Sequence, residues 1–371
     1  MTVTEQALLA EYTTLHLGGP ARRFVAARSS AQLVQEVRAA DVAGDPLLVL
    51  GGGSNLLVAD EGFPGTVLRV ASRGVQMTGG DDAVEVSVAA GENWDDLVRR
   101  CIAAGLSGIE CLSGIPGLAG ATPIQNVNAY GQDVAHTITA VRAYDRLLDA
   151  EAVMPAAECE FGYRTSVFKR QADRGRGADL NPAAATGRHV VLGVTFRLAR
   201  DPLSAPVRYA ELARLLGVSE GERVPLADAR EAVLQLRRGK GMVLDPGDPD
   251  TRSAGSFFTN PVLAAGQFAQ LEAGVAGPDG AAPRIPHWDA GDGQVKVSAA
   301  WLIERAGFGK GFPAGERAGA RISTKHALAL TNPDGGTAAD LIGLARQIRD
   351  GVQARFGVRL ENEPVLVGVQ L

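Results

Sequence analysis

A glycine-rich turn between two apolar stretches places the strongest limit on what this chain can fold into. In LVLGGGSNLLVAD, residues 48–60, three consecutive glycines follow a run that is typical of a buried strand. Glycine allows backbone N–H groups to approach a diphosphate closely, because no Cβ intervenes. The stretch lacks the Lys-Ser/Thr of a P-loop and the helix that follows a Rossmann fingerprint. The turn is therefore either a nucleotide cradle outside both classes or a plain tight turn.

The first third of the chain predicts an alternation of strands and helices. Residues 21–27 and 46–50 have the composition of strands, and a helix that Ser29 or Ser30 caps lies between them. The residues after the glycine turn predict more strand and turn rather than helix, because they are β-branched and interrupted by Gly and Pro.

A second block of strand and helix precedes a long segment without a regular period. Residues 82–91 alternate apolar and polar side chains, as a strand does, and Asn93 is placed to cap a helix that begins at Trp94 and that Gly105 ends. Residues 108–134 are rich in Gly, Ala and Asn and follow neither period. A loop of this length in a compact domain is usually functional, and its apolar content argues against disorder.

The remainder of the chain predicts a charged excursion, a boundary and a helical end. Residues 172–188 are charged and rich in Gly, Pro and Ala, which indicates an excursion between two strands. A domain boundary is expected over residues 205–225, followed by a helix over 227–241 and later by a loop over residues 274–294. Thr337 is placed to cap a long last helix, and a terminal strand follows over residues 364–371.

Composition excludes several classes of function. The chain has 371 residues with 37 basic and 42 acidic side chains, so 37 − 42 gives a net charge of −5 and no basic surface for nucleic acid. The five histidines never occur as H-x-x-x-H or beside cysteine, so no metal site is expected. No apolar run is long enough to span a bilayer. The three cysteines form no C-x-x-C and the start has no signal-peptide character, so we expect a cytoplasmic protein with reduced thiols.

Five short segments place polar residues where composition expects apolar ones. Arg164 lies in FGYRTSVFKR, which we interpret as strand-like, and Ser256 stands directly before two phenylalanines. Lys240 ends LRRGK, where cations stabilise the C-terminus of a helix. His326 lies in ISTKHALALTN, which predicts a strand, and Glu363 heads an apolar row in the terminal strand. Taken singly, each has an ordinary structural explanation, and a buried carboxylate such as Glu363 would need a partner or a bulge.

Together with the two glycine loops, these segments occur in the order of one family. The chain resembles the UDP-N-acetylenolpyruvoylglucosamine reductases, the MurB family of peptidoglycan synthesis. The resemblance is carried by TTLHLGGPA, VLGGGSNLLV, SGIPGLAGATPIQNVNAYGQDV, YRTSVFK, RRGKGMVLDP, AGSFFTNP, KVSAAWLIERAGFGKG, STKHALALTN and LENE. Each motif alone is weak, whereas nine in order over nearly the whole chain are very specific.

The resemblance implies an α+β fold of the vanillyl-alcohol-oxidase or PCMH type that binds FAD, with a C-terminal α+β substrate-binding domain. We expect FAD-binding subdomains over residues 1–72 and 73–212, the substrate-binding domain over 213–354, and a returning terminal strand over 355–371. It also implies NADPH as co-substrate. The FAD is expected to be non-covalent, because the glycine motifs VLGGGSNLLV and SGIPGLAGATPIQNVNAYGQDV contain no His or Cys that could attack the ring.

The family's cofactor positions map onto the two glycine loops. The residues implied at the pyrophosphate are Gly51, Gly52, Gly53, Ser54 and Asn55. Those implied along the rest of the flavin are Ile115, Pro116, Gly117, Gly120, Gln125, Asn126 and Gly131. One departure falls here, because Asn128 stands where the family pattern has glycine.

Matching of motifs also assigns catalytic and substrate-binding positions. The catalytic positions are Arg164, Ser256 and Glu363. The substrate-binding positions are Tyr163, Lys240, Asn260 and His326, and Tyr209 is the candidate for the tyrosine of a loop that closes over the UDP group in the type I branch. A second departure is Pro364, which follows Glu363 where the family has proline before the glutamate.

The implied reaction is the NADPH-dependent, FAD-mediated reduction of UDP-N-acetylglucosamine enolpyruvate to UDP-N-acetylmuramate. Hydride added to the β-carbon places negative charge on the α-carbon and carboxylate, so a cation and a proton donor are required there. Arg164 is expected to hold the carboxylate, Ser256 to protonate the α-carbon and Glu363 to orient this network. The alternatives are a flavoprotein oxidase of the same fold that acts on a hydroxy acid or alcohol, and a nucleotide-binding protein without catalytic activity.

Overall fold

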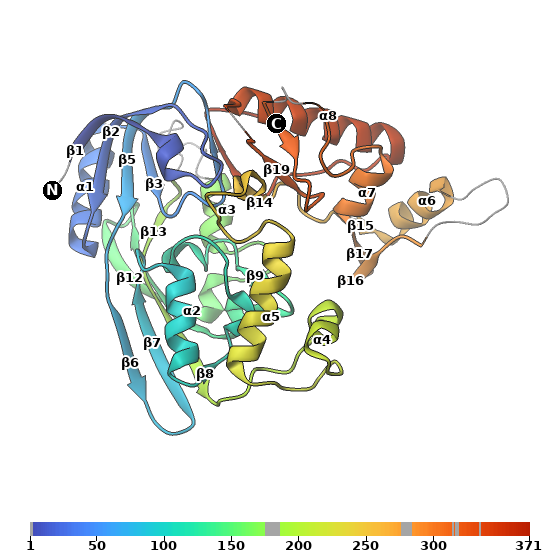
Figure 1. Ribbon diagram of the computed structural model, residues 1–371. Coiled ribbons are helices and arrows are strands. Elements are labelled where there is room, and N and C mark those ends of the chain that lie inside the picture. Colours follow the sequence, from blue (N-terminus) through green and yellow to red (C-terminus); the bar gives the residue numbers. More distant parts are fainter. Residues whose placement is uncertain (1–2, 175–185, 276–283, 314, 316–318, 334) are drawn as a thin grey trace. The chain divides into compact units, whose positions relative to one another are not determined.

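The computed structural model describes residues 3–174, 186–275, 284–313, 315, 319–333 and 335–371 (Figure 1). Contacts divide the chain into two units, and each is described by itself. Unit 1 comprises residues 1–7, 20–53 and 63–243, and unit 2 comprises residues 8–19, 54–62 and 244–371. The first glycine turn, residues 51–55, thus contains a point where the chain passes from unit 1 to unit 2.

Unit 1 begins with a four-stranded sheet covered by a helix. In spatial order its strands are β1 (Val3–Leu8), β2 (Pro20–Ala27), β5 (Phe63–Val70) and β3 (Leu47–Leu50). Both β2 and β3 run parallel to β5, as a β-α-β crossover requires. The helix α1 (Ser30–Ala43) lies along this sheet, and the Ser29 side chain caps it by accepting from the Gln32 N–H (Figure 1). The predicted strands and cap are confirmed.

The second sheet of unit 1 is antiparallel. Its strands, in spatial order, are β12 (Ala150–Pro155), β11 (Ile138–Asp145), β13 (His189–Arg200), β7 (Ala83–Ala89) and β6 (Val75–Gly79), with β8 (Leu106–Ser107) also pairing with β13. The helix α2 (Trp94–Ala103) packs Trp94, Leu97 and Val98 into the core beside this sheet, and Asn93 caps it as predicted.

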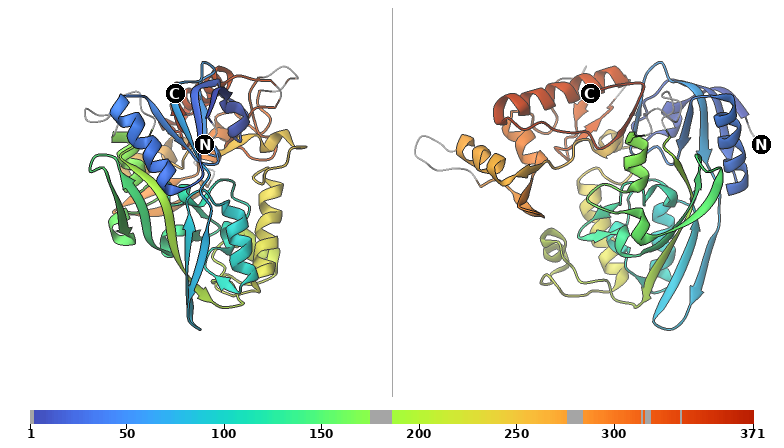
Figure 2. Two further views of the ribbon diagram at one scale, coloured as in Figure 1. Left: turned by 90° about the vertical axis from the view of Figure 1, so that its left-hand side faces the viewer. Right: turned by 180° about the vertical axis from the view of Figure 1, so that it is seen from behind.

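Three further helices complete unit 1. They are α3 (Val167–Arg174), α4 (Ala210–Leu216) and α5 (Leu226–Gly239). The helix α5 lies beside α2 (Figures 1 and 2). Its Ala229 and Val233 share a small core with Cys111 and Leu212. Contacts divide the chain after Val243, and this core joins α5 to α4 and to the segment of Cys111 within unit 1.

Unit 2 is built from short strands and a long helix. One sheet has the spatial order β14 (Ser253–Ser256), β19 (Ala329–Thr331) and β18 (Arg321–Ile322). A second has the order β15 (Val262–Ala264), β17 (Gln294–Val297) and β16 (His287–Gly291). A third is the parallel pair β20 (Val365–Val367) and β4 (Leu56–Val58). Its helices are α6 (Ala265–Val275), α7 (Ala299–Arg305) and α8 (Ala338–Phe356). Thr337 and Asp340 form a capping box at the start of α8, so the predicted helix and cap are confirmed.

Two interpretations of the sequence in unit 2 are wrong. The segment around Lys325 and His326 is not one strand but a turn between β18 and β19. Residues 287–297 form the antiparallel hairpin β16–β17 where we expected a loop, because Gly291 and Gly293 adopt the left-handed conformation that a tight hairpin turn requires. Of the charged excursion at residues 172–188, residues 175–185 lie outside the described part of the chain.

Candidate flavin and substrate site

The two glycine loops touch each other backbone to backbone in unit 1. A Cβ built on Gly52 would lie 2.7 Å from the Cα of Gly117, which no side chain tolerates. Gly53 adopts φ 60°, a left-handed conformation that favours glycine. Both positions therefore need glycine for a physical reason, and the two loops pack main chain against main chain, an arrangement that we call the glycine seat. Such a seat suits a diphosphate and a flat ring, which is the chemistry expected of FAD.

The second loop is anchored to the antiparallel sheet. The Gly120 N–H donates to the Ala90 carbonyl at 2.9 Å, and a Cβ on Gly120 would lie 2.4 Å from the Cβ of Ala90. The Gly117 carbonyl accepts from the N–H of Trp94, the first residue of α2. The loop contains 3-10 turns at Glu110–Leu112 and Ala119–Ala121 and the short pair β9 (Asn128–Ala129) and β10 (Gln132–Asp133). It is an ordered element, fixed at several points.

The amide side chains of this loop tie it to the segment of Arg164. Asn126 donates from Nδ2 to the Gly162 carbonyl at 3.0 Å, and Gln125 accepts from the Lys169 ammonium at 3.3 Å. Asn128, which departs from the family pattern, donates to the Asn126 carbonyl at 3.3 Å. The departure is thus accommodated by a local hydrogen bond within the loop.

The strand expected around Arg164 is absent, and this prediction is wrong. Gly162 and Thr165 instead close a tight turn through two backbone hydrogen bonds, of 3.0 and 3.2 Å. Within it Arg164 adopts φ 51°, a conformation that arginine rarely takes and that costs about 1 kcal/mol or more. Tyr163 is 44% exposed in the same turn. A strained, well-anchored turn is typical of a functional site, which agrees with the role that we expected for Arg164.

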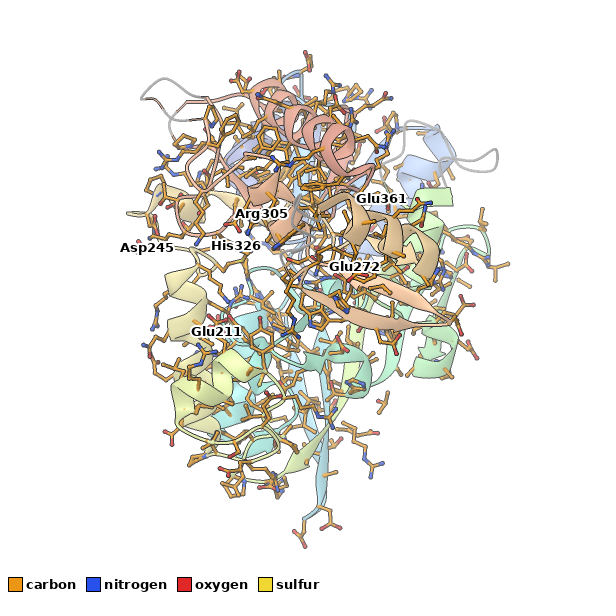
Figure 3. All side chains as sticks on the ribbon, turned by 90° about the vertical axis from the view of Figure 1, so that its right-hand side faces the viewer. Glu211, Asp245, Glu272, Arg305, His326 and Glu361 are labelled. Carbon is orange, nitrogen blue, oxygen red and sulfur yellow. The ribbon has the colours of Figure 1, made fainter. Side chains whose placement is uncertain are left out.

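Four side chains of unit 1 form what we call the lysine–tyrosine cluster: Tyr130, Tyr209, Glu211 and Lys240. The rings of Tyr130 and Tyr209 meet edge to face at 5.3 Å. The Lys240 ammonium lies 5.9 Å from the centre of the Tyr130 ring and 2.6 Å from the Glu211 carboxylate. Glu211 belongs to α4 and is labelled in Figure 3. The structure thus brings the expected residues Tyr209 and Lys240 together.

Sequence reasoning missed Tyr130 and Glu211 in this cluster. Burial raises the pKa of Tyr130 to about 12, so its phenol stays neutral and can donate a hydrogen bond. The only sequence signal was the position of Tyr130 inside the conspicuous NAYG segment. Glu211 had none, because one glutamate in the first turn of a helix is ordinary.

In unit 2, Phe257, the residue that follows Ser256, is hydrogen-bonded through its main chain to Glu363. Ser256 ends β14, and the next residue, Phe257, donates from its N–H to Leu328 and accepts from the N–H of Glu363 at 2.8 Å. Phe257 and Phe258 are each 1% exposed and pack edge to face at 5.2 Å. The positions of Ser256 and Glu363 are therefore set by the main chain and a rigid aromatic anchor.

Asn55, from the first glycine turn, also lies at Glu363. Its Nδ2 donates to the Glu363 carbonyl at 3.4 Å, and its own carbonyl accepts from the Val365 N–H at 3.0 Å. The expected alternation of Glu363 with Val365 and Val367 on one strand face is wrong. The strand β20 begins only at Val365, because Glu363 and Pro364 pass out of the strand toward the Phe257 backbone.

The other two substrate positions lie in ordered turns of unit 2. Asn260 accepts from the Ala299 N–H at the start of α7 at 3.0 Å. The N–H of His326 donates to the Ser323 hydroxyl at 3.2 Å, and Figure 3 labels this histidine. Beside it, Lys325 forms an ion pair with Asp248 at 2.5 Å, and this hydrogen bond raises the pKa of the lysine.

Within the described ranges no group of three or more His, Cys, Asp and Glu side chains is arranged to hold a metal ion. Burial raises the thiol pKa of Cys101, Cys111 and Cys159, so these thiols are unreactive at neutral pH. None of the helices described here is long and apolar enough to cross a membrane.

Comparison with known proteins agrees with this geometry. The profile of the C-terminal domain of UDP-N-acetylenolpyruvoylglucosamine reductase matches residues 248–367, and that of an FAD-binding domain matches residues 21–185. The reductase of Thermobifida fusca is 59% identical over 98% of this chain and 97% of its own length. That of Streptomyces coelicolor is 54% identical over 98% and 90%, respectively. The crystal structure of the Thermus caldophilus enzyme (MurB) has a TM-score of 0.60 at 26% identity and covers 99% of both chains.

These findings define the class of protein first. The chain is an FAD-binding oxidoreductase with the α+β, PCMH-type flavin fold and a C-terminal α+β domain, as the sequence predicted. It belongs to the UDP-N-acetylenolpyruvoylglucosamine reductase family.

Proposed function

We propose that this chain reduces UDP-N-acetylglucosamine enolpyruvate to UDP-N-acetylmuramate with electrons from NADPH, in the synthesis of peptidoglycan precursors. Its membership of the reductase family over nearly the whole chain carries this proposal. The sequence composition is compatible with work in the cytoplasm.

When bound, FAD would supply the hydride chemistry that links NADPH to the enolpyruvyl double bond. The backbone contact between Gly52 and Gly117 supports the fit of FAD, since a Cβ at Gly52 would push apart the two glycine loops that the cofactor is expected to contact. We assign the pyrophosphate to Gly51, Gly52, Gly53, Ser54 and Asn55. The flavin positions are Ile115, Pro116, Gly117, Gly120, Gln125, Asn126 and Gly131. We expect the link to be non-covalent.

We assign the chemistry at the substrate to Arg164, Ser256 and Glu363. The planar guanidinium of Arg164 suits a carboxylate better than an ammonium does, and it stabilises the charge that develops on the carboxylate. Ser256 donates its hydroxyl proton to the α-carbon, which is a strong base once hydride has been added to the β-carbon. Glu363 orients this network. The backbone bond between Phe257 and Glu363 supports the assignment, because it fixes the two segments against each other.

Recognition of the sugar nucleotide is assigned to Tyr163, Lys240, Asn260, His326 and Tyr209. The lysine–tyrosine cluster supports this assignment for Lys240 and Tyr209. Lysine is a compact positive charge that suits a diphosphate, and the half-exposed ring of Tyr209 is placed to cover a bound group.

The absorbance of the purified protein tests the function directly. We expect a yellow protein whose flavin absorbance is bleached by NADPH without oxygen and restored by the enolpyruvyl substrate, with UDP-N-acetylmuramate as product. A flavin that only oxygen reoxidises, coupled to oxidation of a hydroxy acid, would contradict the proposal and indicate an oxidase. A protein without flavin would contradict it as well.

A further inference from the structure

Glu110 is a fully buried carboxylate that is held by N–H groups instead of a cation. It lies in the 3-10 turn Glu110–Leu112 of the second glycine loop and is 0% exposed. Its side chain accepts from the N–H groups of Gly108 at 2.7 Å, Gln132 at 2.9 Å and Ala205 at 2.6 Å. Within the described ranges it forms no ion pair. Such a group needs an explanation, because burial of a charge is strongly unfavourable.

Another buried carboxylate of unit 1 shows the ordinary arrangement. The Glu36 side chain, on α1, is 8% exposed and forms an ion pair with Arg23 at 2.8 Å. The donors of Glu110 come instead from three separate stretches of the chain. A carboxylate held in this way joins the stretches that supply its donors, because a buried N–H group that moved away would lose its partner at a high cost. The role of Glu110 therefore depends on the segments that it joins.

The first of these segments is the hairpin that carries Tyr130. Tyr130 and Gly131 form the two-residue turn between β9 and β10, with φ of 50° and 84°. Tyrosine rarely adopts such a left-handed conformation, which persists only where the surroundings fix it. Gln132 follows the turn directly, and its amide donates to Glu110 and accepts from the Cys111 N–H at 2.7 Å. The bond between Gln132 and Glu110 thus fixes the hairpin at the base of its strained turn.

The second segment is the arm that leads to Tyr209. Ala205 donates its N–H to Glu110 and lies four residues before Tyr209, which directly precedes α4. The oxygen that accepts from Ala205 is Oε1, and the same oxygen accepts from Gln132. One buried oxygen therefore bridges the Tyr130 hairpin and the Tyr209 arm.

The hairpin and the arm meet again at the lysine–tyrosine cluster. A Cβ on Gly131 would lie 3.0 Å from the Cβ of Arg208, so the turn packs closely against the arm. One residue further along each segment, the rings of Tyr130 and Tyr209 meet edge to face at 5.3 Å. The Lys240 ammonium lies 5.9 Å from the centre of the Tyr130 ring. A shift of either segment would therefore change the tyrosine pair and the surroundings of the lysine.

We propose that Glu110 is a positioning residue for substrate binding, whose bridge between the Tyr130 hairpin and the Tyr209 arm sets the spacing of the two tyrosines for a sugar nucleotide. This inference rests on the proposed function and deepens it, because it assigns control of affinity to a residue outside the cluster. A carboxylate suits this role, since one of its oxygens accepts from two segments at once. The bridge fixes the backbones, while the exposed side chains of the cluster can still move.

The test is the half-saturating concentration of enolpyruvyl substrate for reoxidation of the NADPH-reduced flavin in the holoenzyme. Gln132→Met removes the hairpin bond while keeping the length of the side chain. We expect this concentration to rise about 5- to 10-fold, as for a lost buried hydrogen bond, with a nearly native limiting rate. Glu110→Met removes both bonds of the bridge and should have a larger effect. If it fails to fold, Gln132→Met still decides the question.

Glu110→Gln is the conservative variant. With its amide oxygen at the position of Oε1, it still accepts from Gln132 and Ala205 and gives up only the bond from Gly108. We therefore expect its half-saturating concentration to stay within about threefold of the native value. Glu36→Met is the matched control, since it removes a buried carboxylate of the same unit that belongs to α1. Both half-reactions should remain native in this control.

A double-mutant cycle separates positioning from a general loosening of the fold. In a Tyr209→Ala background, Gln132→Met should have little further effect, because the bridge acts through the tyrosine pair. The rate of flavin reduction at saturating NADPH should stay native in Gln132→Met, because the bridge serves substrate binding.

A native half-saturating concentration in Gln132→Met would overturn the inference. So would the same fold-increase in the Tyr209→Ala background, a parallel loss of flavin reduction by NADPH, or a Glu110→Gln variant as impaired as Gln132→Met. Failure of the native protein to pass electrons to the enolpyruvyl substrate would instead contradict the proposed function, so the two failures are distinguishable.

Discussion

Two groups of side chains that we assign to the substrate are held in different ways. In unit 2, the segments of Ser256 and Glu363 are joined by main-chain hydrogen bonds through Phe257, which is buried. In unit 1, the contacts described between members of the lysine–tyrosine cluster are side-chain contacts, and the side chains of Lys240 and Glu211 are 32% and 39% exposed.

This difference in how the two groups are held indicates a division of work between the chemical step and substrate binding. Proton transfer needs a donor that is fixed to a fraction of an ångström, and a backbone framework provides this. Binding of a large sugar nucleotide needs groups that can move as the ligand enters, and exposed side chains can do so at little cost, because exposed ion pairs contribute about 0–1 kcal/mol. We therefore expect the unit 2 segments to control the rate of the chemical step and the cluster to control affinity.

The largest effect is expected for Ser256→Ala. Loss of a positioned proton donor costs roughly 10²- to 10⁴-fold, whereas loss of a structural hydroxyl hydrogen bond costs about 0.5–1.5 kcal/mol. Stopped-flow absorbance should show normal flavin reduction by NADPH and slow reoxidation by the enolpyruvyl substrate. Ser253→Ala on the same strand is the control, since the bond described at its hydroxyl is a local one from the Gly255 N–H. Equal slowing of both half-reactions in Ser256→Ala would show that this residue only shapes the pocket.

The next effect concerns the glycine seat, which is also built from main chain. Gly52→Ala places a Cβ 2.7 Å from the Cα of Gly117, and overpacking of this kind costs about 1–3 kcal/mol. We expect FAD affinity to fall about 5- to 150-fold, because each 1.4 kcal/mol is tenfold. Fluorescence titration of the apoprotein with FAD measures this. Gly80→Ala, which meets no atom within 4 Å, should bind FAD normally. Native affinity in Gly52→Ala would contradict the seat.

Lys240→Ala tests the other side of the comparison. Loss of a hydrogen bond to a charged group costs about 1.5–3 kcal/mol, so we expect KM for the enolpyruvyl substrate to rise about 10- to 150-fold. The kcat should change only a few-fold, because the interaction is made equally before and during the chemical step. Steady-state kinetics give both values. Arg238→Ala, which removes an exposed cation of the same helix, should change neither, and a collapse of kcat in Lys240→Ala would refute the division of work.

The smallest effect is expected in the framework of unit 2. Thr337→Ala removes the side-chain cap of α8 and should lower the free energy of unfolding by about 1 kcal/mol. Thr337→Ser retains the hydroxyl and should remain close to the native stability. Denaturant unfolding measures both. Since Thr337 is not among the residues assigned to FAD or to the substrate, both half-reactions should keep their native rates. A slowed half-reaction would show that the active segments depend on this helix.

Sequence patterns predicted the parts of the fold that local rules determine. The capped helices α1, α2 and α8 follow from a capping residue and an apolar face, and both are readable within about 18 residues. The turn at Arg164 was not predictable, because Tyr163, Thr165 and Val167 have the composition of a strand. Its geometry depends on a bond from the distant Asn126.

The candidate site shows even more clearly that local sequence patterns do not predict tertiary contacts. The motifs predicted which residues matter, but Arg237 and Arg238 are identical neighbours in sequence, and only tertiary packing buries one and exposes the other. Glu363 was placed on a strand by alternation, which could not foresee that Phe257 pairs with it outside that strand. Long-range contacts decide these positions, and no local pattern encodes them.

The central claim is that the backbone-held segments serve the chemical step and the side-chain cluster serves binding. The most direct test is the rate of flavin reoxidation as a function of enolpyruvyl substrate concentration in Ser256→Ala and Lys240→Ala. The account predicts that excess substrate restores the native limiting rate in Lys240→Ala, whereas Ser256→Ala stays slow at saturation with a nearly native half-saturating concentration. A native limiting rate in Ser256→Ala, or a slow one in Lys240→Ala at saturation, would contradict it.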